Sequence, residues 1–411
     1  MGVKGLYCSN IEMTNLKYVV KMKSHQADMI SSRLAHLDIE LTERCNNACI
    51  HCLINQPEYD ANAYAREMHT DMVRKLLQEA AGLGCMTVRF TGGEPLLRYD
   101  FAELYLFTRR LGMWVILFTN ARLITPEIAQ LLARIPPGRP VEVTVYGMRA
   151  ESYDAAAATR GAFGEFWRGV SLLREYKIPF VVKQSLLPSN RAEMTEFDAF
   201  AAELSAMEGK KPGYAMNFDL RARRDDPLKN RSIAALRLSP VETVAVLARN
   251  PEYRRGMREF AGKFMGPPGD KLFACGAGLG VCVDAYGKAQ MCMGLRHPEM
   301  VFDLSSRAES GDGIQFALDG VFPKWREMRA KNPDYLRRCA VCFLKGLCEQ
   351  CPAKSWMEHG TLDKPVEYLC QVAHAQAIYL GLLREGERSW ELPEPEWRER
   401  VAHFVNNELE V

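Results

Sequence analysis

Three cysteines, Cys45, Cys49 and Cys52, form a C-x3-C-x2-C triplet within one short segment. Three thiolates at this spacing can hold three irons of a [4Fe–4S] cube and leave the fourth iron without a protein ligand. An iron with an open position can bind a small molecule and do chemistry on it. The alternative is a structural zinc site, which takes four ligands, usually in C-x2-4-C pairs. The triplet alone favours the open cluster and leaves zinc as an alternative.

The cysteine segment lies between two predicted strands. Before it, His36–Leu41 alternates apolar and polar residues, which is typical of a strand. After it come a helical stretch, Thr70–Ala81, and a second strand, Met86–Thr91, which runs into Gly92-Gly93-Glu94-Pro95. A lone Gly-Gly pair indicates only a turn. At the end of the strand that follows the cysteine loop, however, glycines allow backbone groups to approach a ligand closely.

Together these two motifs resemble the signature of the radical S-adenosylmethionine (SAM) enzymes. The resemblance implies that the open iron chelates the amino and carboxylate groups of SAM. It also implies that four residues bind the amino group of SAM's methionine part, namely Gly92, Gly93, Glu94 and Pro95. His51 directly precedes the last cysteine, at a position where a flat ring can shield the cluster.

Between about residues 36 and 220, short apolar strands alternate with amphipathic helical stretches. The predicted strands are His36–Leu41, Met86–Thr91, Met113–Thr119, Val141–Tyr146, Phe180–Leu186 and Tyr214–Asp219. The predicted helices are Thr70–Ala81, Phe101–Leu111, Pro126–Ile135, Phe163–Tyr176 and Arg191–Ser205. This alternation predicts an α/β fold with a parallel sheet of βα units, and it agrees with the partial (β/α)6 TIM barrel of radical SAM enzymes. Ligands of such folds lie at the C-terminal ends of the strands, where both motifs occur.

Further SAM contacts follow from the resemblance at equivalent strand ends. Thr119 and Asn120 end the third strand, Thr144 lies on the fourth, and Arg160 begins the next helix. A permanently charged, planar guanidinium suits the SAM carboxylate, and related enzymes place an arginine near it. Thr144 is explained equally well by the preference of threonine for strands. No residue indicates a substrate-side acid, base or hydrogen donor.

Eight more cysteines follow in the C-terminal half. Cys275 to Cys292 reads C-x11-G-x4-C, and Cys339 to Cys351 reads C-x2-C-x5-C-x2-C, with Cys370 after it. The pattern closely resembles the SPASM extension of radical SAM enzymes, although the last short spacing is one residue tighter than in that family. The resemblance implies two auxiliary [4Fe–4S] clusters. The first would use Cys275, Cys282, Cys292 and Cys351, with Cys282 as the fourth ligand, and the second would use Cys339, Cys342, Cys348 and Cys370. A zinc ribbon is the alternative for the C-x2-C pairs.

Bulk properties narrow the class of protein. The 411 residues carry a net charge of +2, which predicts no general attraction to nucleic acid or to a membrane. The first residues contain no apolar signal-peptide core, so a cytoplasmic protein is expected. Thirteen cysteines in such a protein favour cluster ligation over disulfides. The predicted organisation is an N-terminal extension (1–35), a radical SAM barrel (36–220), a connector (221–274), a SPASM domain (275–385) and a helical tail (386–411) that packs onto the body.

The resemblance implies an oxidoreductase that cleaves SAM reductively and uses the resulting 5′-deoxyadenosyl radical to remove hydrogen from a substrate. Enzymes with SPASM domains mostly modify peptides, so the leading hypothesis is a maturase that forms a thioether or carbon–carbon cross-link in a ribosomally synthesised peptide. The enzyme alternatives are a peptide epimerase, a sulfatase-type formylglycine-forming maturase and a tetrapyrrole side-chain-processing enzyme. The non-enzyme alternative is an iron–sulfur electron-transfer protein. The implied partners are the precursor peptide, a flavodoxin- or ferredoxin-type electron donor and a separate peptide-recognition protein.

Overall fold

The structure is a computed structural model that describes residues 34–208, 214–217, 220 and 227–406. These residues form two compact units. The barrel unit contains described residues up to 236 together with 276–325, and the C-terminal unit contains residues 237–275 together with 326–406. The predicted N-terminal extension lies almost wholly outside the described residues.

Six parallel strands form the main sheet of the barrel unit, adjacent to one another in the order β1-β4-β5-β6-β7-β8. Their bounds are β1 Leu37–Thr42, β4 Thr87–Gly92, β5 Trp114–Thr119, β6 Val141–Val145, β7 Phe180–Ser185 and β8 Tyr214–Asn217. The α/β fold predicted from the alternation is therefore confirmed. Both ends of each predicted strand lie within two residues of the observed ends.

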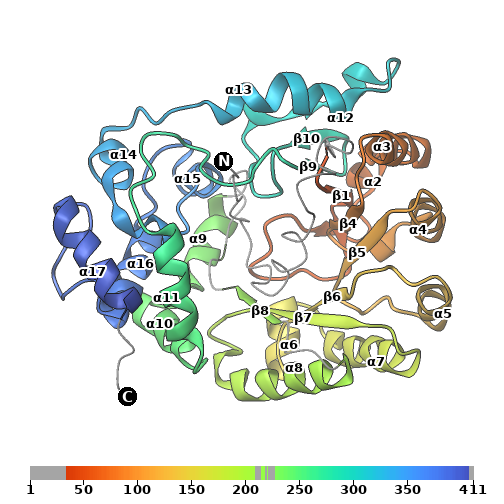
Figure 1. Cartoon of the computed structure of the whole chain (residues 1–411). Helices are drawn as coiled ribbons and strands as arrows, with labels where there is room; N and C mark the ends of the chain where they lie inside the picture. Colours follow the sequence, from red (N-terminus) through yellow and green to blue (C-terminus); the bar gives the residue numbers. More distant parts are fainter. Residues whose placement is uncertain (1–33, 209–213, 218–219, 221–226, 407–411) are drawn as a thin grey trace, which may run out of the picture. The chain divides into compact units, whose positions relative to one another are not determined.

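Helices cover the outer side of these strands, as α3, α4, α5, α7 and α8 show in Figure 1. The helices of this part are α2 Ala61–Arg66, α3 Thr70–Gly82, α4 Phe101–Arg110, α5 Pro126–Arg134, α6 Ala150–Ala157, α7 Ala162–Glu175, α8 Met194–Glu208 and α9 Pro227–Ala235. Sequence periodicity explains their orientation, since Val73, Leu76, Leu77 and Ala80 form one buried face of α3. Backbone pairing sets the register of the strands, and the strands position the loops at their C-terminal ends.

A second segment, far away in the sequence, completes this sheet beside β1. Strand β9, Val281–Val283, pairs in parallel with β1, so that Leu37 lies opposite Val281. Strand β10, Lys288–Gln290, pairs antiparallel with β9, and β11, Phe302–Asp303, pairs antiparallel with β10. Two short helices follow, α12 Gly313–Phe316 and α13 Phe322–Arg326. The cysteine loop adds a small parallel pair of its own, β2 Arg44–Cys45 with β3 Gln56–Pro57.

The C-terminal unit is helical within its described residues. Its helices are α10 Pro240–Ala248, α11 Tyr253–Phe264, α14 Pro333–Arg337, α15 Pro352–His359, α16 Glu367–Leu380 and α17 Glu394–Asn406. Its core joins Phe343, Ala377 and Leu380 to Trp397 and Phe404 of α17. The rings of Phe343 and Trp397 stack with centroids 5.5 Å apart. The tail therefore packs against its own unit, as its helical spacing predicts.

Candidate active site

The three N-terminal cysteines lie on one loop at the C-terminal end of β1. Cys45 ends β2, and Cys49 and Cys52 follow in the next turn; Cys45 and Cys49 are buried and Cys52 is half-buried. The loop backbone is attached to the end of α6, because the amides of Ala48 and Ile50 donate to the carbonyls of Ala157 and Ala156 at 3.0 and 3.1 Å. Two hydrogen bonds therefore fix the backbone of the cysteine loop to the end of α6.

The Gly-Gly-Glu-Pro segment extends β4 directly against the cysteine loop. The amide of Gly93 donates to the Thr42 carbonyl at 2.7 Å, and the amide of Glu94 donates to the Arg44 carbonyl at 2.9 Å. Glycine is required at Gly92 because its φ is +119° and a Cβ there would lie 2.1 Å from the Thr42 oxygen. The two sequence motifs are thus joined through backbone hydrogen bonds.

Glu94 lies at the centre of a hydrogen-bond network at the strand ends. Its carboxylate accepts from Thr119 Oγ1 at 2.9 Å and from the Asn120 amide at 2.8 Å. The Asn120 side chain continues toward the loop, with Nδ2 2.8 Å from Asn46 Oδ1 and 3.8 Å from Cys45 Sγ. Three residues predicted from the sequence, Glu94, Thr119 and Asn120, therefore lie together beside a predicted cluster ligand.

The Glu94 carboxylate is fully buried, and its charge is only partly compensated. Burial raises the pKa of Glu94 to about 7, while the donors at Asn120 and Thr119 lower it. The positive charge of Arg122 is a smaller cause that also lowers this pKa. A ligand that carries an ammonium group would stabilise the charged carboxylate further.

The buried thiols of the cysteine loop carry no charge in the absence of a metal. Burial, with Glu94 next in importance, raises the pKa of Cys45 well above its usual value. Burial and the neighbouring Cys52 raise the pKa of Cys49 to about 12. These thiols are therefore neutral at pH 7 until a metal displaces their protons. Three thiols on one short loop match the donor set of a [4Fe–4S] cluster that has one open iron.

His51 is a half-buried, uncharged ring in this loop. Burial, with the positive charge of Lys229 as a smaller cause, lowers the pKa of His51 to about 4. Its ring lies 5.8 Å from that of Tyr146, measured between centroids. The shielding of the cluster by this ring stays a prediction.

Arg122 is a residue of the site that sequence reasoning missed. Its guanidinium donates to the Asn46 carbonyl, to Asn47 Oδ1 at 2.5 Å and to Glu165 at 2.8 Å. It thereby attaches the cysteine loop to α7. The only sequence signal was its position two residues after Asn120, just beyond the end of β5.

Two buried ion pairs support the loop from behind. Arg44 donates to Glu67 at 2.7 Å, and Arg98 donates to Asp100 at 2.7 Å through both Nε and Nη2. The remaining nitrogen of Arg98, Nη1, donates to the Leu41 carbonyl at 3.1 Å. Arg98 therefore holds the end of β1 immediately before the cysteines.

Two further predicted SAM contacts lie elsewhere. Thr144 is half-buried on β6, and Arg160 is exposed in the turn before α7. Neither takes part in the network of Glu94 and Asn120 described above. Their roles stay predictions.

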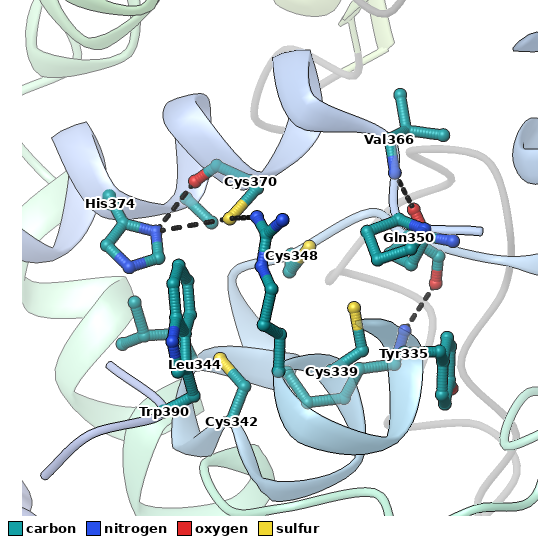
Figure 2. Close-up of a pocket in the computed structure, with 14 residues that line it drawn as sticks. Tyr335, Cys339, Cys342, Leu344, Cys348, Gln350, Val366, Cys370, His374 and Trp390 are labelled. Atoms are coloured by element: carbon teal, nitrogen blue, oxygen red, sulfur yellow. Dashed lines mark hydrogen bonds between the residues drawn. The ribbon is translucent and has the colours of Figure 1, made fainter. Parts of the chain in front are cut away.

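In the C-terminal unit, four cysteines line one cavity: Cys339, Cys342, Cys348 and Cys370. Figure 2 shows their sulfur atoms around a common space with His374 and Trp390 at its side. Across the described residues, no three Cys, His, Asp or Glu side chains are close enough to hold a single metal ion. A cube of four irons spreads its ligands more widely, and the four thiols fit that donor set. Of the other predicted set, Cys275 and Cys351 belong to the C-terminal unit and Cys282 and Cys292 to the barrel unit, so this set stays a prediction.

Comparisons with known proteins agree with this geometry. Residues 39–201 match the radical SAM superfamily. The chain is 28% identical over 343 residues to an AdoMet-dependent heme synthase from Methanosarcina barkeri, a match that covers 78% of this chain and 92% of that protein. It is 28% identical over 341 residues to the mycofactocin maturase MftC from Mycolicibacterium smegmatis, covering 79% and 80% of the two chains. It is 29% identical over 168 residues to a PqqA peptide cyclase from Bradyrhizobium diazoefficiens, covering 41% and 43%.

A solved structure shares the fold. Streptococcus suis SuiB bound to S-adenosylmethionine has a TM-score of 0.59 and 15% sequence identity, covering 82% of this chain and 77% of that one.

The parallel barrel sheet, the cysteine loop and the Gly-Gly-Glu-Pro segment together define an enzyme built on a radical SAM domain. The chain carries a radical SAM domain over residues 39–201, and the proteins that it resembles include both maturases and synthases. The family implies a [4Fe–4S] cluster and SAM as cofactors. None of the helices in the described ranges is long and apolar enough to cross a membrane.

Proposed function

We propose that this enzyme modifies a ribosomally synthesised precursor peptide by an oxidative reaction that forms a thioether or carbon–carbon cross-link. The observation that carries the radical chemistry is the direct hydrogen bonding of the Gly-Gly-Glu-Pro segment to the backbone beside Cys45. When bound, the cluster and SAM supply an electron that breaks a carbon–sulfur bond of SAM and a 5′-deoxyadenosyl radical that removes hydrogen from the substrate. The protein supplies the binding, the orientation and the exclusion of water.

The residues at the strand ends have separate tasks in this proposal. The cluster is held by Cys45, Cys49 and Cys52. The buried Glu94 carboxylate accepts hydrogen bonds from the amino group of SAM. Thr119 and Asn120 fix the carboxylate of Glu94 through hydrogen bonds of 2.9 and 2.8 Å.

The SAM carboxylate needs a positive partner, for which Arg160 remains our proposal. Its exposed side chain is available for a ligand. Arg122, the buried alternative, is already committed to Glu165 and to the cysteine loop. Thr144 is proposed as a weaker contact on β6.

Two auxiliary [4Fe–4S] clusters are part of the proposal. The cavity lined by Cys339, Cys342, Cys348 and Cys370 supports one of them. The other would use Cys275, Cys282, Cys292 and Cys351. With four thiolates each, neither cluster would offer an open iron, so both would serve electron transfer and structure. A flavodoxin- or ferredoxin-type protein in the cytoplasm would be the electron donor, and a separate protein would bind the precursor peptide.

A second candidate function is the processing of a tetrapyrrole side chain. The match to the AdoMet-dependent heme synthase favours it, because that match covers 92% of the relative. The match to the peptide cyclase covers 43% of its relative and supports the peptide reading. Both candidates use the same site for SAM and differ in the substrate.

The test is an anaerobic incubation in deuterated solvent with SAM and dithionite, with any small peptide encoded beside this protein as one substrate and an iron-containing tetrapyrrole as the other. Release of 5′-deoxyadenosine and the mass of each substrate are followed together. Loss of two hydrogens from the peptide supports cross-linking, whereas deuterium gain without hydrogen loss supports epimerisation. A change in the tetrapyrrole mass alone would overturn the peptide proposal. A Cys45→Ala variant should release no 5′-deoxyadenosine in any arm.

A further inference from the structure

The four-cysteine cavity of the C-terminal unit is bordered by side chains that point hydrogen-bond donors at two of its sulfur atoms. Figure 2 shows His374 beside Cys370, and Trp390 beside Cys342. Within the C-terminal unit, Arg338, His374 and Trp390 line this cavity together with the cysteines. This arrangement bears on how strongly a cluster in the cavity would attract an electron.

Arg338 provides a fixed positive charge beside Cys370. Its Nη2 lies 3.6 Å from Cys370 Sγ. Two hydrogen bonds to Glu367, at 2.6 and 3.0 Å, hold the guanidinium, and its carbon centre lies 4.6 Å from the centre of the Trp390 ring. Its Nε is buried and has no hydrogen-bond partner among the described residues. A buried N–H without an acceptor is costly.

His374 provides a second donor to the same sulfur. Its Nδ1 lies 2.8 Å from the Cys370 carbonyl oxygen and 3.6 Å from Cys370 Sγ. Since a carbonyl oxygen only accepts, Nδ1 carries the proton. The Ser389 amide donates to Nε2 at 3.3 Å, so that nitrogen has none. The ring is therefore neutral and oriented with its N–H toward Cys370.

Ser389 provides a donor to a different cysteine. Its hydroxyl oxygen lies 3.0 Å from Cys342 Sγ. A thiolate that binds iron has no proton, so in a loaded site the hydroxyl can donate to it, while His374 Nε2, 3.2 Å from the same hydroxyl, accepts from the Ser389 amide. Ser389 is fully buried, which removes competing water from this contact.

We propose that Arg338, His374 and Ser389 raise the reduction potential of the iron–sulfur cluster held by Cys339, Cys342, Cys348 and Cys370. This inference rests on the proposed auxiliary cluster and goes beyond it by assigning the residues that tune it. Reduction adds one electron, and hence one negative charge, to the cluster. Positive charge and N–H or O–H donors at the sulfurs stabilise the reduced form more than the oxidised one. The potential therefore lies higher than it would without them.

The raised reduction potential matters because the proposed oxidative reaction releases an electron from the substrate. After hydrogen removal, the substrate radical loses one electron and one proton to become a closed-shell product. A bound cluster would be the acceptor for that electron, the solvent would take the proton, and an external one-electron carrier of the flavodoxin or ferredoxin class would reoxidise the cluster. A higher potential favours electron transfer from the substrate radical to the cluster.

The experiment is a redox titration with dithionite, followed by electron paramagnetic resonance, in a background where Cys45, Cys49 and Cys52 are all replaced by alanine. Arg338→Gln removes the charge at the cavity, and the matched control Arg337→Gln removes the same charge from a neighbouring residue whose side chain is 74% exposed. We expect Arg338→Gln to disfavour reduction of one cluster about tenfold, which for a one-electron couple is about 59 mV. Arg337→Gln should leave the reduction potential of every cluster unchanged.

Iron content separates the outcomes. If Arg338→Gln retains its iron and no potential changes, the inference is wrong while the proposed cluster stands. If a Cys348→Ala variant has the iron content and spectrum of its parent, the proposed cluster itself is wrong. Should Arg338→Gln lose iron, Ser389→Ala replaces it, because this change leaves the pair between Arg338 and Glu367 intact. Ser389→Ala must then lower the same potential, and an unchanged potential overturns the inference.

Discussion

The contact between the two sequence motifs makes a sharp prediction at Gly93. A Cβ at this residue would lie 2.1 Å from the carbonyl oxygen of Arg44, closer than the 3.0 Å that real Cβ atoms keep. Relieving the overlap requires the Arg44 carbonyl to move by about 0.9 Å. That shift strains the bonds from Gly93 to Thr42 and from Glu94 to Arg44, which measure 2.7 and 2.9 Å. Overpacking costs about 1 to 3 kcal/mol and a lost hydrogen bond about 1 kcal/mol.

We therefore expect Gly93→Ala to destabilise the barrel unit by about 2 to 4 kcal/mol. Because Arg44 directly precedes Cys45, the same shift should displace the cluster ligand. Urea unfolding of the apoprotein under argon, followed by circular dichroism, measures the first effect. Iron content after anaerobic reconstitution measures the second.

Gly164→Ala is the matched control for this change. Gly164 is exposed on α7, and a Cβ there would meet nothing within 4 Å. Gly164 lies in the first turn of α7, where alanine is favoured over glycine by less than the roughly 0.5 to 1 kcal/mol of a helix interior, so this variant should be at least as stable as its parent and keep its iron. A Gly93→Ala protein with parental stability and parental iron would refute the proposed coupling of the two motifs.

Three further predictions follow from buried groups. Asp100→Ala breaks the ion pair with Arg98 and should lower the free energy of unfolding in urea by about 3 to 5 kcal/mol. Burial works to raise the pKa of Asp100, but hydrogen bonds from Arg98 outweigh it and lower the pKa. The parent protein should therefore lose this stability as the pH falls below about 4, whereas the variant should not. The affinity for SAM, measured by calorimetry on the reconstituted enzyme, should rise about tenfold from pH 6 to pH 8. The reason is that burial raises the pKa of Glu94 to about 7 and an ammonium group binds the carboxylate form. A flat pH profile in the parent enzyme, or the same rise in Glu94→Gln, would contradict this assignment. Trp397→Ala removes the stacking on Phe343 and should cost about 3 to 5 kcal/mol in the C-terminal unit, seen as a lower midpoint of thermal unfolding; an unchanged midpoint would mean that α17 is not part of the core.

Much of the barrel could be predicted from the sequence, because local patterns determine its elements. On β6, Val141, Val143 and Val145 are buried while Glu142 and Thr144 between them are half-buried, which is the alternation that predicts a strand. Helix α5 begins after Thr125, whose side chain accepts from the Ile128 amide, as a capping residue does.

The candidate site was predictable only where a spacing or motif pointed to it. Glu94 and Cys45 belong to short motifs, so their proximity followed from the order of strands in a parallel sheet. Arg122 and Arg98 belong to no motif, and their partners at Asn47 and Leu41 lie far away in the sequence. Such contacts depend on tertiary packing, which periodicity does not encode.

Strand β9 has a consequence for how the chain is made. Strand β1 has two neighbours, β4 close behind it in the sequence and β9, whose Val281 lies opposite Leu37. During synthesis one edge of β1 therefore stays open until most of the chain has left the ribosome. Open strand edges pair with other chains, and contacts between distant residues form slowly. A shortened chain that ends before Val281 should therefore aggregate even though it contains every residue of the radical SAM motifs.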